Sequence, residues 1–139
     1  LLPRELAELM RGSKDVALAT GSAYLGAFAS PLAPATPNYC LNVGSAACAT
    51  AADVAVAELT EWLARVDAEL PGAQVTICHD GTPFNATTNL PQWTCTNAAA
   101  DPIVIKVGWT RSTTRTGDTG LNRAERPSVV LSVTPGSTV

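Results

Sequence analysis

Four cysteines and a single histidine are the residues most able to carry chemistry in this chain of 139 residues. Cys40 and Cys48 lie eight positions apart, and Cys78 and Cys95 lie seventeen apart. Neither pair has the C-x-x-C spacing that is typical of zinc and redox sites. Two disulfides formed in an oxidising compartment are therefore the better interpretation of the four thiols.

The pairing of the cysteines is open in principle, because four thiols allow three connectivities. We favour Cys40–Cys48 and Cys78–Cys95, since each of these bonds closes a short loop that is rich in turn residues. A ring of that size stabilises a fold by roughly 2–3 kcal/mol on the chain-entropy model. With all four sulfurs bonded, the sequence predicts no metal ligand and no catalytic thiol.

His79 is the only histidine and therefore the only candidate base for a serine or cysteine hydrolase. It is adjacent to Cys78, and in a strand its side chain points to the opposite face. The chain has no G-x-S-x-G motif, and Gly117-Asp118-Thr119-Gly120 lacks the Lys-Ser/Thr of a phosphate-binding loop. We therefore predict no catalytic residue and no cofactor, and a protein that is not an enzyme.

The net charge of −3 conceals an asymmetry along the chain. Residues up to Asp101 include four basic and ten acidic side chains, whereas the remainder includes five basic and two acidic ones. The five basic residues are Lys106, Arg111, Arg115, Arg123 and Arg126. They are few and scattered, so a solvated sheet edge is favoured and nucleic acid is not expected as a partner. A DNA-binding subunit that uses these residues is the alternative.

Two helices are predicted in the first half of the chain. The first lies within residues 1–20, where Leu2, Leu6, Leu9 and Met10 share one face. Residues 21–72 form a proline-rich connector that contains a second helix over 50–70. Thr50 and Asp53 fit a capping box at its start, and an apolar stripe that includes Leu59, Trp62, Leu63 and Val66 runs along it.

Residues 73–139 are predicted to form an antiparallel sheet. Val75 and Ile77 alternate with polar residues, and a later segment places Ile103, Ile105, Val107 and Trp109 on the face opposite Val104, Lys106 and Gly108. A short Trp93–Cys95 segment precedes it, a polar loop spans 111–122, and Val129, Leu131 and Val133 form the last strand. Helices followed by a sheet of about four strands give a single α+β domain over residues 1–139.

Several short motifs resemble the PilV-type minor pilins of the type IV pilus. They occur in the same order as in that family: Ala7-Glu8-Leu9-Met10-Arg11, Gly21 to Tyr24, Cys40 and Cys48, Glu61-Trp62-Leu63, Leu70-Pro71-Gly72, Cys78-His79-Asp80-Gly81-Thr82-Pro83, Cys95, and Val104 to Thr110. The cleavage site of the family and the apolar helix behind it are absent. No run of 18 apolar residues is present. We therefore expect a chain that starts within its N-terminal helix.

The resemblance implies a pilin-like fold, with the N-terminal helix packed on the antiparallel sheet. It also implies a non-enzymatic structural subunit that waits at the inner membrane, facing the periplasm, and then enters the extracellular pilus. The implied partners are other minor pilins, the major pilin and in some cases a tip adhesin, with the missing helix as the membrane anchor. Tyr24, Leu25, Phe28 and the surface of helix 50–70 are the expected subunit contacts.

Two other classes of protein fit the same features. A minor pseudopilin of a type II secretion system shares the architecture and differs in its partners. A free secreted binding module would account for the disulfides without a membrane anchor.

Overall fold

The computed structural model describes residues 2–12, 16–17, 22, 24–29, 31–34, 36–42, 44, 46–70, 72–98, 100–109, 111–112, 121–122 and 127–133. Two helices, α1 (Leu2–Gly12) and α3 (Ala51–Glu69), lie on one face of a sheet. The sheet has the strand order β1-β2-β3-β6, with every neighbouring pair antiparallel. The α+β class and a sheet of four strands were predicted, and both are confirmed.

The four strands of the main sheet are β1 (Gly26–Ala29), β2 (Gln74–His79), β3 (Ile103–Gly108) and β6 (Val129–Val133). Strand β1 lies inside the segment that was expected to be a connector. The strand was not predicted because Gly-Ala-Phe-Ala is too short to show a clear period of two. The Trp93–Cys95 segment is not a strand. The polar stretch after β3 was expected to be a loop, but β4 (Arg111–Ser112) and β5 (Leu121–Asn122) pair with each other there.

Helix α3 starts where the capping box predicted. Thr50 accepts a hydrogen bond from the Asp53 amide at 3.1 Å, and the Asp53 carboxylate accepts one from the Thr50 amide at 3.2 Å. These two bonds satisfy amide groups that have no partner within the helix. The stripe residues Leu59, Trp62, Leu63 and Val66 are buried, as their helical spacing requires.

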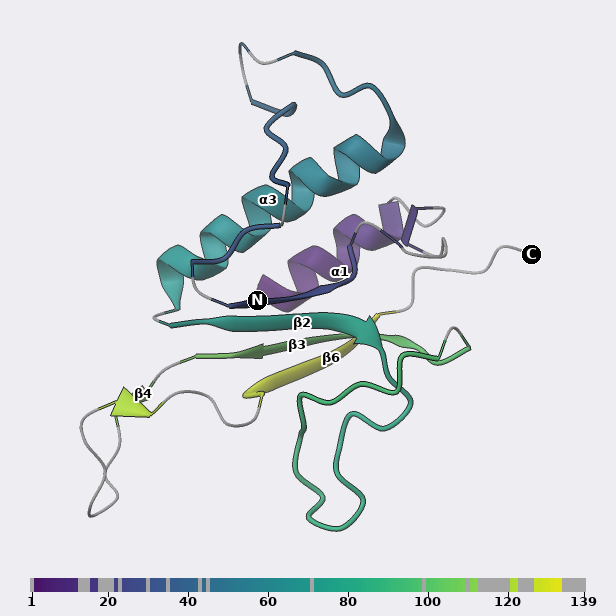
Figure 1. Cartoon of the computed structure of the whole chain (residues 1–139), viewed down its shortest axis with the longest axis vertical. Coiled ribbons are helices and arrows are strands. Elements are labelled where there is room, and N and C mark those ends of the chain that lie inside the picture. Colours follow the sequence, from purple (N-terminus) through teal and green to yellow (C-terminus); the bar gives the residue numbers. More distant parts are fainter. Residues whose placement is uncertain are drawn as a thin grey trace.

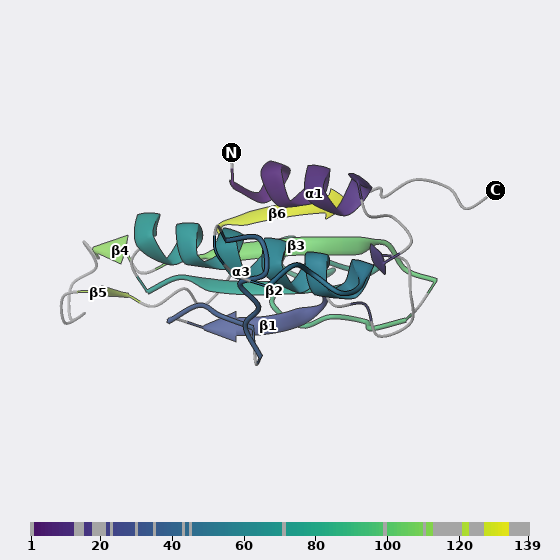
Figure 2. The same cartoon turned by 90° about the horizontal axis from the view of Figure 1, so that it is seen from above.

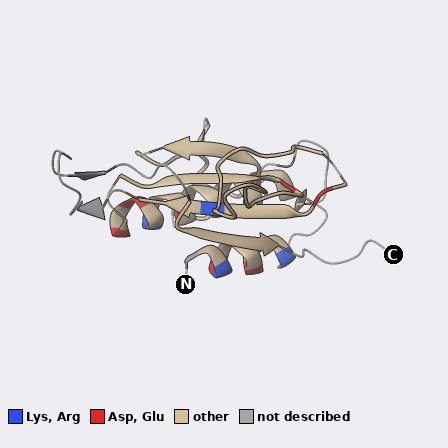
Figure 3. Cartoon of the chain, turned by 90° about the horizontal axis from the view of Figure 1, so that it is seen from below, with Lys and Arg blue, Asp and Glu red and all other residues tan. Residues whose placement is uncertain are grey.

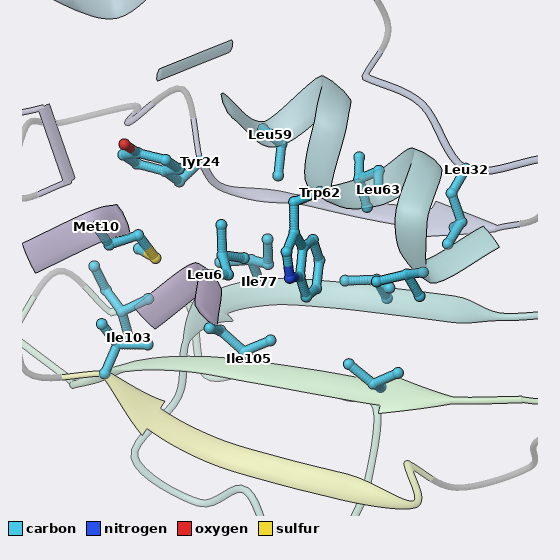
Figure 4. Packing of buried hydrophobic residues seen from close by; sticks show 14 of the residues in the cluster. Leu6, Met10, Tyr24, Leu32, Leu59, Trp62, Leu63, Ile77, Ile103 and Ile105 are labelled. Carbon is cyan, nitrogen blue, oxygen red and sulfur yellow. The ribbon is translucent and has the colours of Figure 1, made fainter. Parts of the chain in front are cut away.

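The core lies between the two helices and the sheet (Figure 4). Trp62 points from α3 toward the sheet and belongs to the same buried cluster as Leu6 of α1 and Ile105 of β3 (Figure 4). Leu6 and Met10 are fully buried and Leu9 packs against the cluster, so the apolar face of α1 turns inward as predicted. The side chain of Leu2 lies outside the described residues.

The register of β2 and β3 gives the sheet two buried faces. Val75 pairs with Val107 and Ile77 with Ile105 on the side of the helices. Thr76 pairs with Lys106 and Cys78 with Val104, and all four of these side chains are buried on the other side. The segment between β2 and β3 (residues 80–102, the 80–102 loop) lies on that side, opposite the helices (Figure 1). The sheet is therefore covered by helices on one face and by a loop on the other.

No helix among the described residues is long and apolar enough to cross a membrane.

Candidate functional site: a buried ion pair beneath a disulfide-closed loop

The charged pair Lys106 and Asp80 is the main polar feature of the molecular interior. Lys106 lies in the middle of the central strand β3, and Asp80 directly follows β2. The Lys106 ammonium forms a salt bridge with the Asp80 carboxylate, and neither side chain has any exposed area. The prediction that Lys106 belongs to a solvated sheet edge is wrong, because β3 is an inner strand and the 80–102 loop covers its second face.

Backbone groups of the 80–102 loop complete the environment of Lys106. The ammonium donates to the carbonyl oxygen of Thr94 at 3.0 Å and to that of Trp93 at 3.4 Å. The sulfur of Cys95 lies 3.9 Å from the same nitrogen. Together with the Asp80 carboxylate, these two carbonyl acceptors hold the loop against the sheet through one ammonium group.

Asp80 is held as a carboxylate by a comparable set of donors. One carboxylate oxygen accepts from the Thr82 amide at 2.9 Å, and the other faces Lys106. Burial by itself raises the pKa of Asp80, but the hydrogen bonds from Lys106 and Thr82 and the charge of Lys106 lower that pKa by more. The net result is a pKa of Asp80 below the ordinary value, so Asp80 is a carboxylate at neutral pH.

The Cys78–Cys95 disulfide closes the loop next to this ion pair. Its Cα atoms are 6.4 Å apart, and it joins the end of β2 to the part of the loop that passes over Lys106. A second disulfide joins Cys40 to Cys48. Both bonds are the pairings expected from loop length, and the chain has no free cysteine.

The atoms of Cys78, Asp80 and Cys95 lie within 4.8 Å of one another, and this is the only such group of potential metal ligands in the described part of the chain. Both sulfurs are bonded to each other, and Asp80 is paired with Lys106. Cysteine binds a metal ion as a thiolate, so the oxidised protein offers no cysteine ligand here.

His79 does not contribute to a catalytic arrangement among the described residues. Its Nδ1 atom lies 2.8 Å from the carbonyl oxygen of Asp101, which fixes the ring at the end of β2. The Asp101 carboxylate instead accepts a hydrogen bond from the hydroxyl of Thr96. A catalytic triad needs the base between a carboxylate and a nucleophile, and this geometry does not supply it.

Gly81 permits the tight return of the loop beside Asp101. A Cβ atom on Gly81 would lie 2.9 Å from an Asp101 carboxylate oxygen, closer than such atoms approach each other in proteins. The Gly81 amide donates to the Thr96 hydroxyl at 3.0 Å. Asp80 therefore supplies the buried carboxylate, and the next residue, Gly81, leaves the space that the Asp101 side chain occupies.

Beyond the ion pair, the 80–102 loop forms a small ribbon that exposes apolar groups. Phe84 and Pro91 form an isolated β-bridge, and the Asn85 amide donates to the carbonyl of Leu90 at 2.8 Å. Phe84 is 48% exposed and Leu90 is 40% exposed. Residues 81–100 include no charged side chain.

A second exposed apolar region lies at the other disulfide. Tyr39 and Leu41, on either side of Cys40, are both exposed. The adjacent hollow has a volume of about 320 Å³ and is lined by Asn38, Tyr39, Cys40, Ala46, Ala47, Cys48, Ala49 and Asp53. Sequence reasoning did not single out either exposed region.

The three residues expected at subunit contacts have different positions. Tyr24 is fully buried, and its hydroxyl donates to a Glu58 carboxylate oxygen at 3.5 Å. Burial raises the pKa of Glu58, the Tyr24 bond opposes that shift, and the charge of Glu61 adds to it. Tyr24 therefore packs in the core, whereas Leu25 and Phe28 pack against the core and keep partial exposure. Subunit contact through Leu25 and Phe28 stays a prediction.

Of the basic residues in the last third of the chain, only Lys106 has a described side chain. Arg111 lies in β4, and Arg115, Arg123 and Arg126 lie outside the described residues.

Comparisons of the chain with models of protein families, with curated proteins and with solved structures give no match.

Proposed function

We propose that this chain is the head of a minor pilin of the type IV pilus, a structural subunit without enzymatic activity. The observation that carries the proposal is the packing of α1 on the antiparallel sheet. The same helix carries the Ala7 to Arg11 motif of the resemblance, and its buried face includes Leu6 and Met10. In a pilin the N-terminal helix carries the head. A helix that packs on the sheet through its apolar face joins these two parts into one body.

The disulfides and the ion pair support the same assignment. A subunit that leaves the cell needs a head that stays folded in an oxidising environment, and disulfides provide that constraint. Head-to-tail contacts between such subunits generate an open helical filament. The described residues hold their polar groups in structural pairs, and no buried side-chain nitrogen or oxygen among them lacks a hydrogen-bond partner.

The proposal is tested with the full-length protein in its own organism. The protein is followed in strains with and without the prepilin peptidase, by immunoblotting of the sheared pilus fraction, the inner membrane and the culture supernatant. A minor pilin is processed and present in the pilus fraction of the first strain. In the second strain it stays unprocessed in the inner membrane.

Two other outcomes would contradict the proposal and identify its rivals. Release into the supernatant in both strains, with unchanged processing, indicates a free secreted binding module. Processing by the peptidase without entry into pili, together with loss of protein secretion on gene deletion, indicates a pseudopilin.

A further inference from the structure

Strand β6 is an edge strand that carries no charged side chain. Within the described part of the chain it pairs with β3 on one side only. Residues 127–133 read Pro-Ser-Val-Val-Leu-Ser-Val and carry no charge, and Val129 is 36% exposed. Natural edge strands are commonly protected by charged residues, by bulges or by a covering element. An uncharged, β-branched edge is a surface to which another strand can be added.

A groove runs between this edge and helix α1. It has a volume of about 280 Å³ and is lined by Arg4, Ala7, Glu8, Arg11, Leu131 and Ser132. Figure 2 shows α1 beside β6 along the same border of the sheet. The strand is uncharged along its length, whereas α1 carries both basic and acidic residues (Figure 3), of which Arg4, Glu8 and Arg11 are exposed. The lining thus combines two apolar residues, Ala7 and Leu131, with three charged residues of α1, Arg4, Glu8 and Arg11, which we call the rim.

The charge of the rim indicates which kind of segment the groove favours. Arg4 and Arg11 are both exposed, and Glu8 neutralises one of them through a salt bridge of 3.1 Å to Arg11. The rim therefore has a net positive charge. A second copy of this chain, paired through the same strand, would bring the same arginines to the same border and repel. An extended segment with acidic side chains instead complements the rim.

We propose that the outer edge of β6 receives an extended, acidic segment of another protein as an additional strand. The backbone of the segment pairs with β6, apolar side chains contact Ala7 and Leu131, and an acidic side chain lies next to Arg4. The inference does not depend on the filament assignment. Failure of the test below would leave the assignment to the pilus unaffected.

The test is a titration of the isotope-labelled chain, followed by amide NMR shifts and by hydrogen exchange. The probe is a synthetic peptide of about nine residues, a common strand length, in which valine alternates with threonine and glutamate. We expect shifts and slower exchange within Val129–Val133. A peptide with lysine in place of glutamate is expected to bind about fivefold more weakly, as the loss of an exposed charge contact implies.

Charge variants separate the groove from general electrostatics. Arg4→Glu is expected to reverse the preference between the two peptides. The control variant Ala64→Glu/Ala68→Glu makes the same change in net charge on the exposed face of α3 and should leave the preference unchanged. The absence of binding, perturbation of β1 instead of β6, or equal effects of the two variants would overturn the proposal.

Discussion

At the scale of single residues, Lys106 and Asp80 are the most consequential pair in the molecule. Removing one partner of a buried ion pair leaves an uncompensated charge, whereas removing both charges together leaves none. The Lys106 ammonium also joins the sheet to the carbonyl groups of Trp93 and Thr94. Stability and the position of the 80–102 loop therefore depend on the same contact.

Lys106→Met is expected to lower the free energy of unfolding by about 3–5 kcal/mol, because Asp80 stays buried without its cation. Lys106→Met/Asp80→Asn should recover most of that loss. Urea unfolding of the two variants measures both values. The exposed control Arg11→Met, which breaks a salt bridge in solvent, should cost less than about 1 kcal/mol. Equal stability of the single and double variants would contradict the pairing.

The lowered pKa of Asp80 predicts acid sensitivity. The folded-state pKa lies below the ordinary value of 3.8, so the carboxylate contributes stability that is fully present above that value. The contribution is lost as the pH falls through the folded pKa. Melting temperatures measured between about pH 2 and pH 7 should therefore fall more steeply at the acid end for the wild type than for Asp80→Asn.

At the scale of elements, the two disulfides serve different segments. Cys40–Cys48 closes a loop ahead of α3, with a sequence separation of 8. Cys78–Cys95 spans 17 positions and lies next to the ion pair. A longer ring restricts the unfolded chain more, although the difference between these two rings is small. The two bonds differ more in the folded protein, where the loop closed by Cys78–Cys95 covers Lys106.

Replacing both cysteines of a bridge by serine is expected to cost about 3 kcal/mol for either pair on entropic grounds. Loss of Cys78–Cys95 should cost more than loss of Cys40–Cys48, since it also loosens the cover over Lys106. Unfolding in urea gives the two costs. Hydrogen exchange of the 80–102 loop should accelerate only in the variant that lacks Cys78–Cys95. Acceleration in both variants would contradict the local role of the Cys78–Cys95 bond.

At the scale of the whole molecule, α1 belongs to the same core as α3 and the sheet. Leu6 and Met10 lie in one cluster with Trp62 and Ile105 (Figure 4). A salt bridge between Glu5 and Arg65 adds a link between the two helices at the surface. The helix and the sheet should therefore unfold together in one transition.

Leu6→Ala is expected to destabilise the whole domain by about 2–5 kcal/mol, because it leaves a cavity between α1 and the sheet. Far-ultraviolet circular dichroism and tryptophan fluorescence should report coincident unfolding curves, since Trp62 lies at that contact. Arg4→Ala, on the exposed side of the same helix, should change stability by less than about 0.5 kcal/mol. Separate transitions for α1 and the sheet would contradict a single core.

Much of the architecture follows from periodic patterns. The spacing of Leu59, Trp62 and Val66 predicted a buried helix face, and the alternation around Ile77 and Ile105 predicted paired strands. These patterns reflect local geometry, which repeats every 3.6 residues in a helix and every two in a strand. Loop length was enough to predict both disulfides.

Patterns along the chain were enough to predict the class of the fold and the capped helix, and loop length favoured the observed cysteine pairs, because each depends on residues close together in the chain. The tertiary structure alone decided that β1 joins the sheet and that Tyr24 is buried. It also decided that Lys106 pairs with Asp80 across 26 positions. Whether a charged residue faces water or a partner depends on what the rest of the chain places over it. No local pattern around Lys106 encodes the loop that covers it.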